Sequence, residues 1–248
     1  MSISYLCGRD CSRRPLLLYY FIKMKHWKKY NESKKHVDSN KIYTVKEAVE
    51  LLKKITVTKF DSTVDVAIKT NANPKYNDQI IRATTILPHG TWKTKRVAVF
   101  VSDDKLEEAK NSWADIVWNT TLINDIKNNK FDFDILITSP DSIRDLVSVA
   151  KQLWPKWLMP TPKAGTVTQN ITQAVEEIKK GKIEFRLDKT WNIHSGIGKL
   201  SFDDSKIEEN LNSFIKAIET NKPTWVKWKL IKKIVLSTTM SPWIQIEC

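Results

Sequence analysis

The chain has 248 residues, which is enough for one large domain or two ordinary ones. Hydrophobic residues make up 41% of it, which is too large a fraction for a disordered chain. Its 41 Lys and Arg against 28 Asp and Glu give a formal net charge of +13, which favours nucleic acid as the partner over a merely solubilising surface. The longest apolar run, Leu16–Ile22, is far shorter than the roughly 20 residues of a membrane span, so we expect no membrane association.

Residues 1–23 differ from the rest of the chain. Three arginines precede the apolar run, but Lys23 follows it where a signal peptide would have small residues. A transit peptide is a weakly supported alternative. We expect residues 1–23 to be a loose extension or a translated upstream region, with the protein proper starting at Met24. The cysteines show no metal-binding spacing and indicate a reducing compartment: Cys7, Cys11 and Cys248.

The patterns before Gly90 predict an amphipathic helix and a half-buried strand. Thr44 and Glu47 have the spacing of a capping box, and the helix that follows places four apolar residues on one face: Ala48, Leu51, Leu52 and Ile55. Val64, Val66 and Ile68 alternate with polar residues, as in a strand with one buried face. We expect Asn71–Gly90 to be a connector with a short helical piece near Gln79–Ala83.

Between Gly90 and Gly181 the strand pattern changes. Arg96–Val101 and Ile135–Thr138 are apolar without alternation, which is typical of strands buried on both faces. A third strand is expected at Asp115–Val117. Helices are expected at Lys105–Asn111, at Leu122–Lys127 and from Pro140 to about Leu153. Short strands that alternate with helices predict a three-layer α/β arrangement with a mostly parallel sheet.

The half-buried pattern returns towards the C-terminus. Asn170 is expected to cap a helix over Ile171–Lys180, and Gly181 to end it in the left-handed conformation. Half-buried strands are predicted at Ile183–Leu187, Lys229–Ser237 and Ile244–Glu247. A long amphipathic helix starts at Asp203 and turns inward Ile207, Leu211, Phe214, Ile215 and Ile218.

The two changes of pattern predict a discontinuous architecture. Residues 24–90 and 183–248 would form one α+β domain, interrupted by an inserted Rossmann-like α/β domain of residues 91–182. Two crossing connections between domains form a hinge, so we expect relative domain motion.

Leu153–Val167 is the most distinctive stretch, reading Leu-Trp-Pro-Lys-Trp-Leu-Met-Pro-Thr-Pro-Lys-Ala-Gly-Thr-Val. Its three prolines predict a stiff, extended, basic loop. The stretch closely resembles the loop of the bacterial-type ribosomal protein L-one family, the large-subunit stalk proteins. Four further stretches resemble that family in the same order: Lys59–Asp65, Leu87–Thr94, Glu184–Phe202 and Ser237–Pro242. The resemblance covers about residues 24–248 and implies the same split, α/β fold.

The resemblance also implies a function. Members are constituents of the large ribosomal subunit and bind its rRNA through the split domain. They assist release of exit-site tRNA and repress translation of their own mRNA. The resemblance implies a cytoplasmic rather than an organellar ribosome. No catalytic activity, metal or cofactor is implied. Carried over, the RNA contacts fall on Lys59, Phe60, Thr63, Asp65, Arg186, Lys189, Lys199, Thr238, Thr239 and Met240.

These residue types suit RNA. Lys and Arg neutralise phosphates, Phe60 and Met240 offer apolar surface to a base, and hydroxyl or carboxylate oxygens can bond ribose 2′-hydroxyls. Asp65 is one methylene shorter than the family's Glu. Ser241 replaces the turn glycine of the family, which would strain the backbone if this position needs a positive φ.

A nucleotide-dependent enzyme built on the inserted domain is the alternative. With Trp92 read as glycine, Gly90–Thr94 would contain Gly-Lys-Thr. A phosphate-binding loop also needs glycine five residues earlier, where Leu87 stands, and Gly-x-Gly-x-x-Gly does not follow the first buried strand. His89 and His194 have no paired nucleophile or carboxylate pattern nearby.

Nine of the ten tryptophans stand where the family has glycine: Trp27, Trp92, Trp113, Trp118, Trp154, Trp157, Trp191, Trp228 and Trp243. Only six glycines remain. Our hypothesis is that the source reads UGA as glycine, whereas the printed sequence translates UGA as tryptophan. The rival interpretation is an RNA-stacking surface of interleaved Trp and Lys, which Trp154-Pro-Lys-Trp157 and Trp225-Val-Lys-Trp228 fit.

Overall fold

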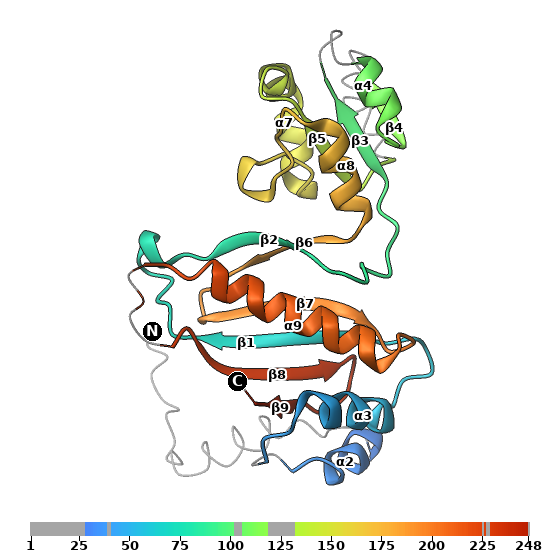
Figure 1. The fold of residues 1–248 in the computed structure, drawn as a ribbon, viewed down its shortest axis with the longest axis vertical. Coiled ribbons are helices and arrows are strands. Elements are labelled where there is room, and N and C mark those ends of the chain that lie inside the picture. Colours follow the sequence, from blue (N-terminus) through green and yellow to red (C-terminus); the bar gives the residue numbers. More distant parts are fainter. Residues whose placement is uncertain are drawn as a thin grey trace, which may run out of the picture.

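The computed structural model describes residues 28–38, 41–101, 106–118, 132–224, 226 and 229–247. Figure 1 shows two bodies, one built on a four-stranded sheet and one on a three-stranded sheet, with a two-stranded ribbon between them. The expected extension of residues 1–23, the expected helix Leu122–Lys127 and the three cysteines lie outside the described residues.

The four-stranded sheet is antiparallel and joins segments far apart in the sequence. Its order is β7 (Asn192–Lys199), β1 (Thr63–Thr70), β8 (Ile231–Thr238) and β9 (Ile244–Ile246). The early strand β1 therefore lies between two late strands, and Tyr43 adds a bridge to Ile246. Neither end of the chain can form this sheet without the other.

Two helices cover one face of this sheet because its strands alternate. Val64, Val66 and Ile68 of β1 are buried, whereas Asp65 and Lys69 are exposed. The covering helices are α3 (Val45–Ile55) and α9 (Asp204–Thr220), and a short helix, α2 (Lys28–Lys35), precedes them. The core that they share contains the predicted apolar residues, of which Leu51 and Ile215 are only partly buried.

One of the two hydrogen bonds of the predicted capping box of α3 is present. The hydroxyl of Thr44 accepts a hydrogen bond from the backbone N–H of Glu47 at 3.5 Å, and the helix starts at the next residue, Val45. Phe214 of α9 packs edge-on against Phe185, with the ring centroids 5.3 Å apart. Phe185 belongs to a strand of the two-stranded ribbon, so this ring contact joins α9 to that ribbon.

The two-stranded ribbon corrects one expectation. Asn71–Gly90 is not only a connector: β2 (Arg82–Ile86) pairs antiparallel with β6 (Lys182–Arg186), and the helical piece is a single 3₁₀ turn, η1 (Asn77–Gln79). No residue of β2 is buried. The strand depends on backbone pairing with a segment about a hundred residues away, which no local hydrophobic pattern records.

The second body has the predicted three layers around a parallel sheet of order β4 (Ile116–Trp118), β3 (Val97–Phe100) and β5 (Ile135–Thr138). All four residues of β3 are buried. Val97 and Val99 pack with α8 (Ile171–Lys179) on one side, and α4 (Leu106–Asn111) contacts that same helix. Ala98 and Phe100 pack on the other side with Leu146, Val149 and Leu153.

The helix expected from Pro140 to Leu153 is broken. It consists of α6 (Ile143–Leu146), the 3₁₀ turn η3 (Val147–Val149) and α7 (Ala150–Leu153). The Ser148 hydroxyl donates to the Asp145 carbonyl at 2.9 Å and competes with the regular backbone bonds there. The predicted helical segment lies in the expected place, but it consists of three consecutive turns and not of one continuous helix.

The expectation of an extended loop over Leu153–Val167 was wrong. The loop contains two 3₁₀ turns, η4 (Trp154–Lys156) and η5 (Pro162–Ala164), each with a proline in its first two positions. Proline fixes φ at a value that a 3₁₀ turn also uses. Asn170 is the N-cap residue of α8, as expected, but its side chain makes no capping hydrogen bond.

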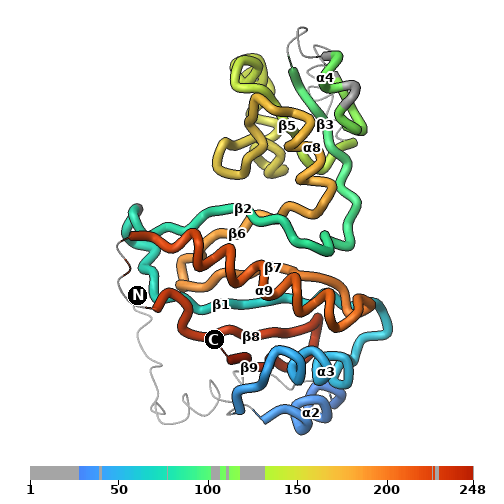
Figure 2. Tube along the Cα trace, in the orientation of Figure 1, coloured from blue at the N-terminus to red at the C-terminus, as the bar shows by residue number. Residues whose placement is uncertain are grey.

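The chain passes twice between the bodies, and Figure 2 traces both connections. They touch at two glycines with positive φ, Gly90 (+67°) and Gly181 (+98°). A Cβ on Gly181 would lie 2.5 Å from the Cα of Gly90, so only glycine permits this approach. Gly181 follows α8 in the left-handed conformation, as predicted.

Candidate RNA-binding interface

Three strands bring most of the expected RNA contacts to one end of the four-stranded sheet. Thr63 at the start of β1 pairs with Lys199 at the end of β7, and Val64 pairs with Thr238 at the end of β8. Figure 1 shows the arrowheads of β7 and β8 where β1 begins. We call the expected contacts at this end the strand-end cluster: Lys59, Phe60, Thr63, Asp65, Lys199, Thr238, Thr239 and Met240.

Two apolar side chains of the cluster are held out towards solvent. Phe60, before β1, is 59% exposed, and Met240, after β8, is 65% exposed. Met240 has φ +66°, so it is the left-handed residue of its turn. The backbone strain that we expected at Ser241, if that position needed a positive φ, therefore lies at Met240. The Thr238 hydroxyl is buried and donates to the Ser241 Oγ at 2.6 Å, which closes the turn that presents Met240.

Residues missed by the sequence reasoning hold the cluster together. Lys199 Nζ donates to the Asp61 carbonyl at 2.9 Å. The Asp61 carboxylate accepts bonds from the Ser201 backbone N–H at 3.1 Å and from the Ser201 hydroxyl at 2.9 Å. The segment before β1 is thereby tied to the segment after β7. Nothing local to Asp61 or Ser201 signals this contact, because 140 residues separate them.

Asp65 lies on the helix-free face of the sheet, between the strand neighbours Gly196 and Ser237. The residue as a whole is exposed, but partial burial of its carboxyl group raises the pKa of that group, and the nearby His194 and Lys199 oppose the shift. The oxygen atoms of this side chain can accept a hydrogen bond from a ribose hydroxyl close to the Lys199 ammonium group.

Trp92 lies over this same part of the face. Its Cη2 atom is 3.0 Å from the position that a Cβ on Gly196 would occupy, and Asp65 and Thr63 surround that position. The Lys199 Nζ lies 5.3 Å from the centre of the Trp92 ring. The indole thus covers three members of the cluster.

Arg186 and Lys189 lie elsewhere. Arg186 ends β6 opposite Arg82, and Lys189 lies in the turn before β7, at the far end of that strand from Lys199. Eight residues of strand span roughly 23 Å. The structure therefore separates these two cations from the strand-end cluster.

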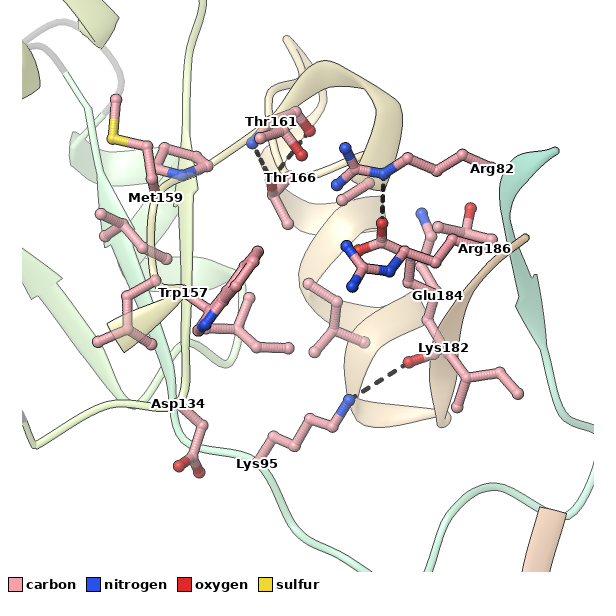
Figure 3. A pocket seen from close by; sticks show the side chains of 18 of the residues that line it. Arg82, Lys95, Asp134, Trp157, Met159, Thr161, Thr166, Lys182, Glu184 and Arg186 are labelled. Carbon is pink, nitrogen blue, oxygen red and sulfur yellow. Dashed lines mark hydrogen bonds and ion pairs between the residues drawn. The ribbon is translucent and has the colours of Figure 1, made fainter. Parts of the chain in front are cut away.

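A pocket of about 600 Å³ lies between the β2–β6 ribbon and the underside of the second body (Figure 3). Arg82, Lys95, Lys182 and Arg186 line it. Burial lowers the pKa of Lys95, and the Asp134 charge partly offsets that effect. Arg82 pairs with Glu184 at 2.5 Å and Lys182 with Glu177 at 2.8 Å. The pocket is basic, but much of its charge is already matched.

The two histidines, which the sequence indicates to be structural or close to RNA and not catalytic, have polar neighbours in the fold. His89 Nε2 lies 2.6 Å from Glu209, and the His89 backbone N–H donates to Asn210 at 3.1 Å. Asn210 is fully buried in α9 and donates to the Ile197 carbonyl of β7 at 3.0 Å. Asn210 therefore fastens the segment before the first crossing to the sheet. His194 lies beside Asp65 and lines the pocket.

A family model described as "Ribosomal protein L1p/L10e family" matches residues 52–242. The chain belongs to this family. Three relatives named "Large ribosomal subunit protein uL1" align over 224 residues, 90% of this chain. They come from Thermosipho africanus (49% identical, 97% of the relative covered), Fervidobacterium nodosum (49%, 95%) and Thermosipho melanesiensis (48%, 97%). The L1-family assignment made from the motifs is confirmed.

The comparisons give no support to the alternative of a nucleotide-dependent enzyme, since the family is one of ribosomal proteins and not of enzymes. Within the described ranges, no group of three His, Cys, Asp or Glu side chains could hold a metal ion. Nor does any helix in the described part of the chain have the length and apolar character to cross a membrane.

Proposed function

We propose that this L1-family chain is a constituent of the large ribosomal subunit and binds large-subunit rRNA through the strand-end cluster. One observation carries the proposal: strands from both ends of the chain converge on an exposed aromatic ring, an exposed methionine, two lysines and several hydroxyl groups. The names of the three relatives support the ribosomal assignment.

Each part of the cluster has a role in this proposal. Lys59 and Lys199 neutralise phosphates, and the salt dependence of binding follows from the counterions that they release. Phe60 and Met240 stack on or pack against unpaired bases. Asp65, Thr63 and Thr239 accept or donate hydrogen bonds to ribose 2′-hydroxyls, which distinguish RNA from DNA. Arg186 and Lys189 contact RNA that continues along β7.

The family resemblance supports a wider proposal for the whole molecule. Residues 24–90 and 183–248 form the RNA-binding domain, and residues 91–182 form an inserted domain that moves about the Gly90–Gly181 crossing. This motion assists release of deacylated exit-site tRNA on the cytoplasmic ribosome. A site on the protein's own mRNA that is similar to the rRNA site would bind the same cluster and repress translation.

The test is a double substitution, Phe60→Ala with Met240→Ala. Both side chains are mostly exposed, so the unfolding midpoint should change little, whereas affinity for an rRNA fragment should fall about tenfold or more. Tyr76→Ala is the matched control, because Tyr76 is 60% exposed but follows β1, at the other end of that strand. Equal affinity of the double variant and the control variant would refute the proposed site.

The mRNA proposal has its own measurement. A fragment of the protein's own mRNA should compete with the rRNA fragment for the chain, and the double variant should weaken both complexes by a similar factor. A variant that loses rRNA but keeps mRNA would show that the two RNAs use different surfaces.

A further inference from the structure

Three tryptophans have a backbone conformation that favours glycine. Four non-glycine residues in the described part of the chain have a positive φ, and three of them are Trp113 (59°), Trp157 (58°) and Trp191 (68°). Two glycines have almost the same values, Gly90 (67°) and Gly165 (66°). A bulky side chain is an outlier in this region, because its Cβ crowds the neighbouring carbonyl oxygen.

The loop between α7 and α8 contains a direct internal comparison. Its first 3₁₀ turn, η4, ends at Trp157 with φ 58° and ψ 26°, and the Trp157 N–H donates to the Trp154 carbonyl. Its second, η5, ends at Gly165 with φ 66° and ψ 24°, and the Gly165 N–H donates to the Pro162 carbonyl. The two turns have the same ending, with glycine in one and tryptophan in the other.

Trp113 occupies the position after a helix where glycine is usual. Helix α4 ends at Asn111, the Ser112 N–H donates to the Ala109 carbonyl at 3.2 Å, and the left-handed residue follows. Such a residue ends many helices and is usually glycine. The Trp113 side chain is 80% exposed, so little packing offsets the backbone strain.

Trp191 closes the turn between β6 and β7. Its N–H donates to the Asp188 carbonyl at 3.1 Å, and the Asp188 N–H donates to the Asn192 carbonyl at 2.8 Å. A three-residue hairpin turn of this kind ends with a left-handed residue, for which glycine is the standard choice. The three tryptophans thus occupy three different motifs that share one requirement, a residue in the left-handed conformation, for which glycine is the usual choice.

The composition points the same way. Globular proteins average about 7% glycine, so a chain of this length would have roughly 17. This chain has 6 glycines and 10 tryptophans. We propose that the residue which the cell inserts at positions 113, 157 and 191 is glycine, encoded by a reassigned UGA codon. We assign the same codon to residue 92, where the family pattern also has glycine although φ is not positive.

The assignment at residue 92 changes the RNA-facing surface, and this step rests on the proposed function. With glycine at 92, the indole over Gly196 is gone, and the ammonium group of Lys199 loses its aromatic neighbour. Asp65, Thr63 and Lys199 then form an open recess in which a ribose–phosphate segment can approach the backbone of β7. The rival interpretation, in which Trp92 stacks on a base, predicts the opposite effect of removing the ring.

The deciding experiment uses the native protein. The gene's codons are sequenced, and the protein isolated from the ribosomes of its source is digested and analysed by peptide mass spectrometry. We expect UGA codons and glycine masses at residues 92, 113, 157 and 191. A tryptophan mass or a UGG codon at any of residues 113, 157 and 191 would overturn the proposal, whatever the chain binds. The same finding at residue 92 would overturn that assignment and the recess.

A recombinant series tests the backbone argument separately. The triple variant Trp113→Gly, Trp157→Gly and Trp191→Gly should melt at least about 5 °C above the printed sequence, and alanine at the same three positions should gain less. Trp154→Gly is the control, because Trp154 has φ −57° and glycine there should bring no gain. Equal midpoints of the triple glycine and triple alanine variants would refute the strain argument.

Trp92→Gly tests the recess. Its affinity for the rRNA fragment should rise at least about threefold, with the unfolding midpoint unchanged. If affinity falls or stays the same while the Phe60→Ala, Met240→Ala variant still binds weakly, the recess is refuted and the proposed function stands. If the double variant also binds normally, the proposed function fails instead.

Discussion

At the scale of single residues, Asp65 links the RNA-facing surface to stability. Burial places the pKa of its carboxyl group in the folded protein above the ordinary value of 3.8. Ionisation of Asp65 therefore favours the unfolded chain. This penalty is absent below the unfolded-state pKa, grows as pH rises towards the raised folded-state pKa, and is complete above it.

We predict that Asp65→Asn raises the free energy of unfolding at pH 7, by less than about 1 kcal/mol because the side chain is partly exposed. The gain should vanish in urea titrations below pH 3.8. Asp188 is the control of opposite sign. A bond from the Lys189 backbone N–H lowers the Asp188 pKa, so Asp188→Asn should lose stability at pH 7 and regain it in acid. If the change in unfolding free energy has the same pH dependence in both variants, the opposite pKa shifts assigned to Asp65 and Asp188 are contradicted.

At the scale of elements, the crossing of the two connections depends on Gly181. A Cβ there would lie 2.5 Å from the Gly90 Cα and 2.6 Å from the Thr91 nitrogen, both backbone atoms that cannot rotate away. The left-handed φ of +98° adds its own cost. We predict that Gly181→Ala lowers the free energy of unfolding by about 3 kcal/mol or more, measured by urea denaturation.

The control for this prediction is Gly165→Ala. Gly165 also has a positive φ, but its added Cβ would meet the end of the flexible Lys182 side chain, which can move. Its cost should be limited to about 1 kcal/mol of backbone strain. If both variants lose the same stability, the contact between the two connections contributes nothing.

Elements with a strong local signal could be predicted from the sequence. The alternation of Val64, Val66 and Ile68 gave β1, the unbroken apolar run gave β3, and Thr44 gave the start of α3. β2 and the two 3₁₀ turns of the proline-rich loop were missed. β2 is stabilised by distant backbone pairing, and proline allows both an extended chain and a 3₁₀ turn.

The same limit applies to the candidate site. The motifs supplied the residue types. Strand register brought four of the ten expected contacts together, and four more lie in the segments that adjoin these strand ends. The sequence could not show that Arg186 and Lys189 lie at the far end of β7 from Lys199. All three belong to one motif, and only the course of the strand shows which end each of them occupies. Nor could it show that Asp61 and Ser201 tie the cluster. Trp92 was identified only as a departure from the family pattern, and its place over Asp65 emerged from the fold.

At the scale of the whole molecule, the separation of the cations predicts how binding depends on RNA length. Lys59 lies beside the exposed Phe60, whereas Lys189 lies at the opposite end of β7, roughly 23 Å away along the strand. Each lysine that neutralises a phosphate adds about 0.7 to 0.9 to the slope of log affinity against log salt. A short RNA can engage only one end of the sheet, whereas a long RNA can engage both.

We therefore predict that Lys59→Ala makes the fall of log affinity with log salt less steep by nearly one unit, on any rRNA fragment that binds. Lys189→Ala should leave the slope unchanged on a short fragment that covers only the strand-end cluster, and should lower it on a fragment that extends along β7. Affinities measured between about 50 and 200 mM salt give both slopes. If Lys189→Ala also weakens the salt dependence of affinity on the short fragment, the bound RNA lies at the other end of the sheet. A ligand confined to the strand-end cluster cannot reach that lysine.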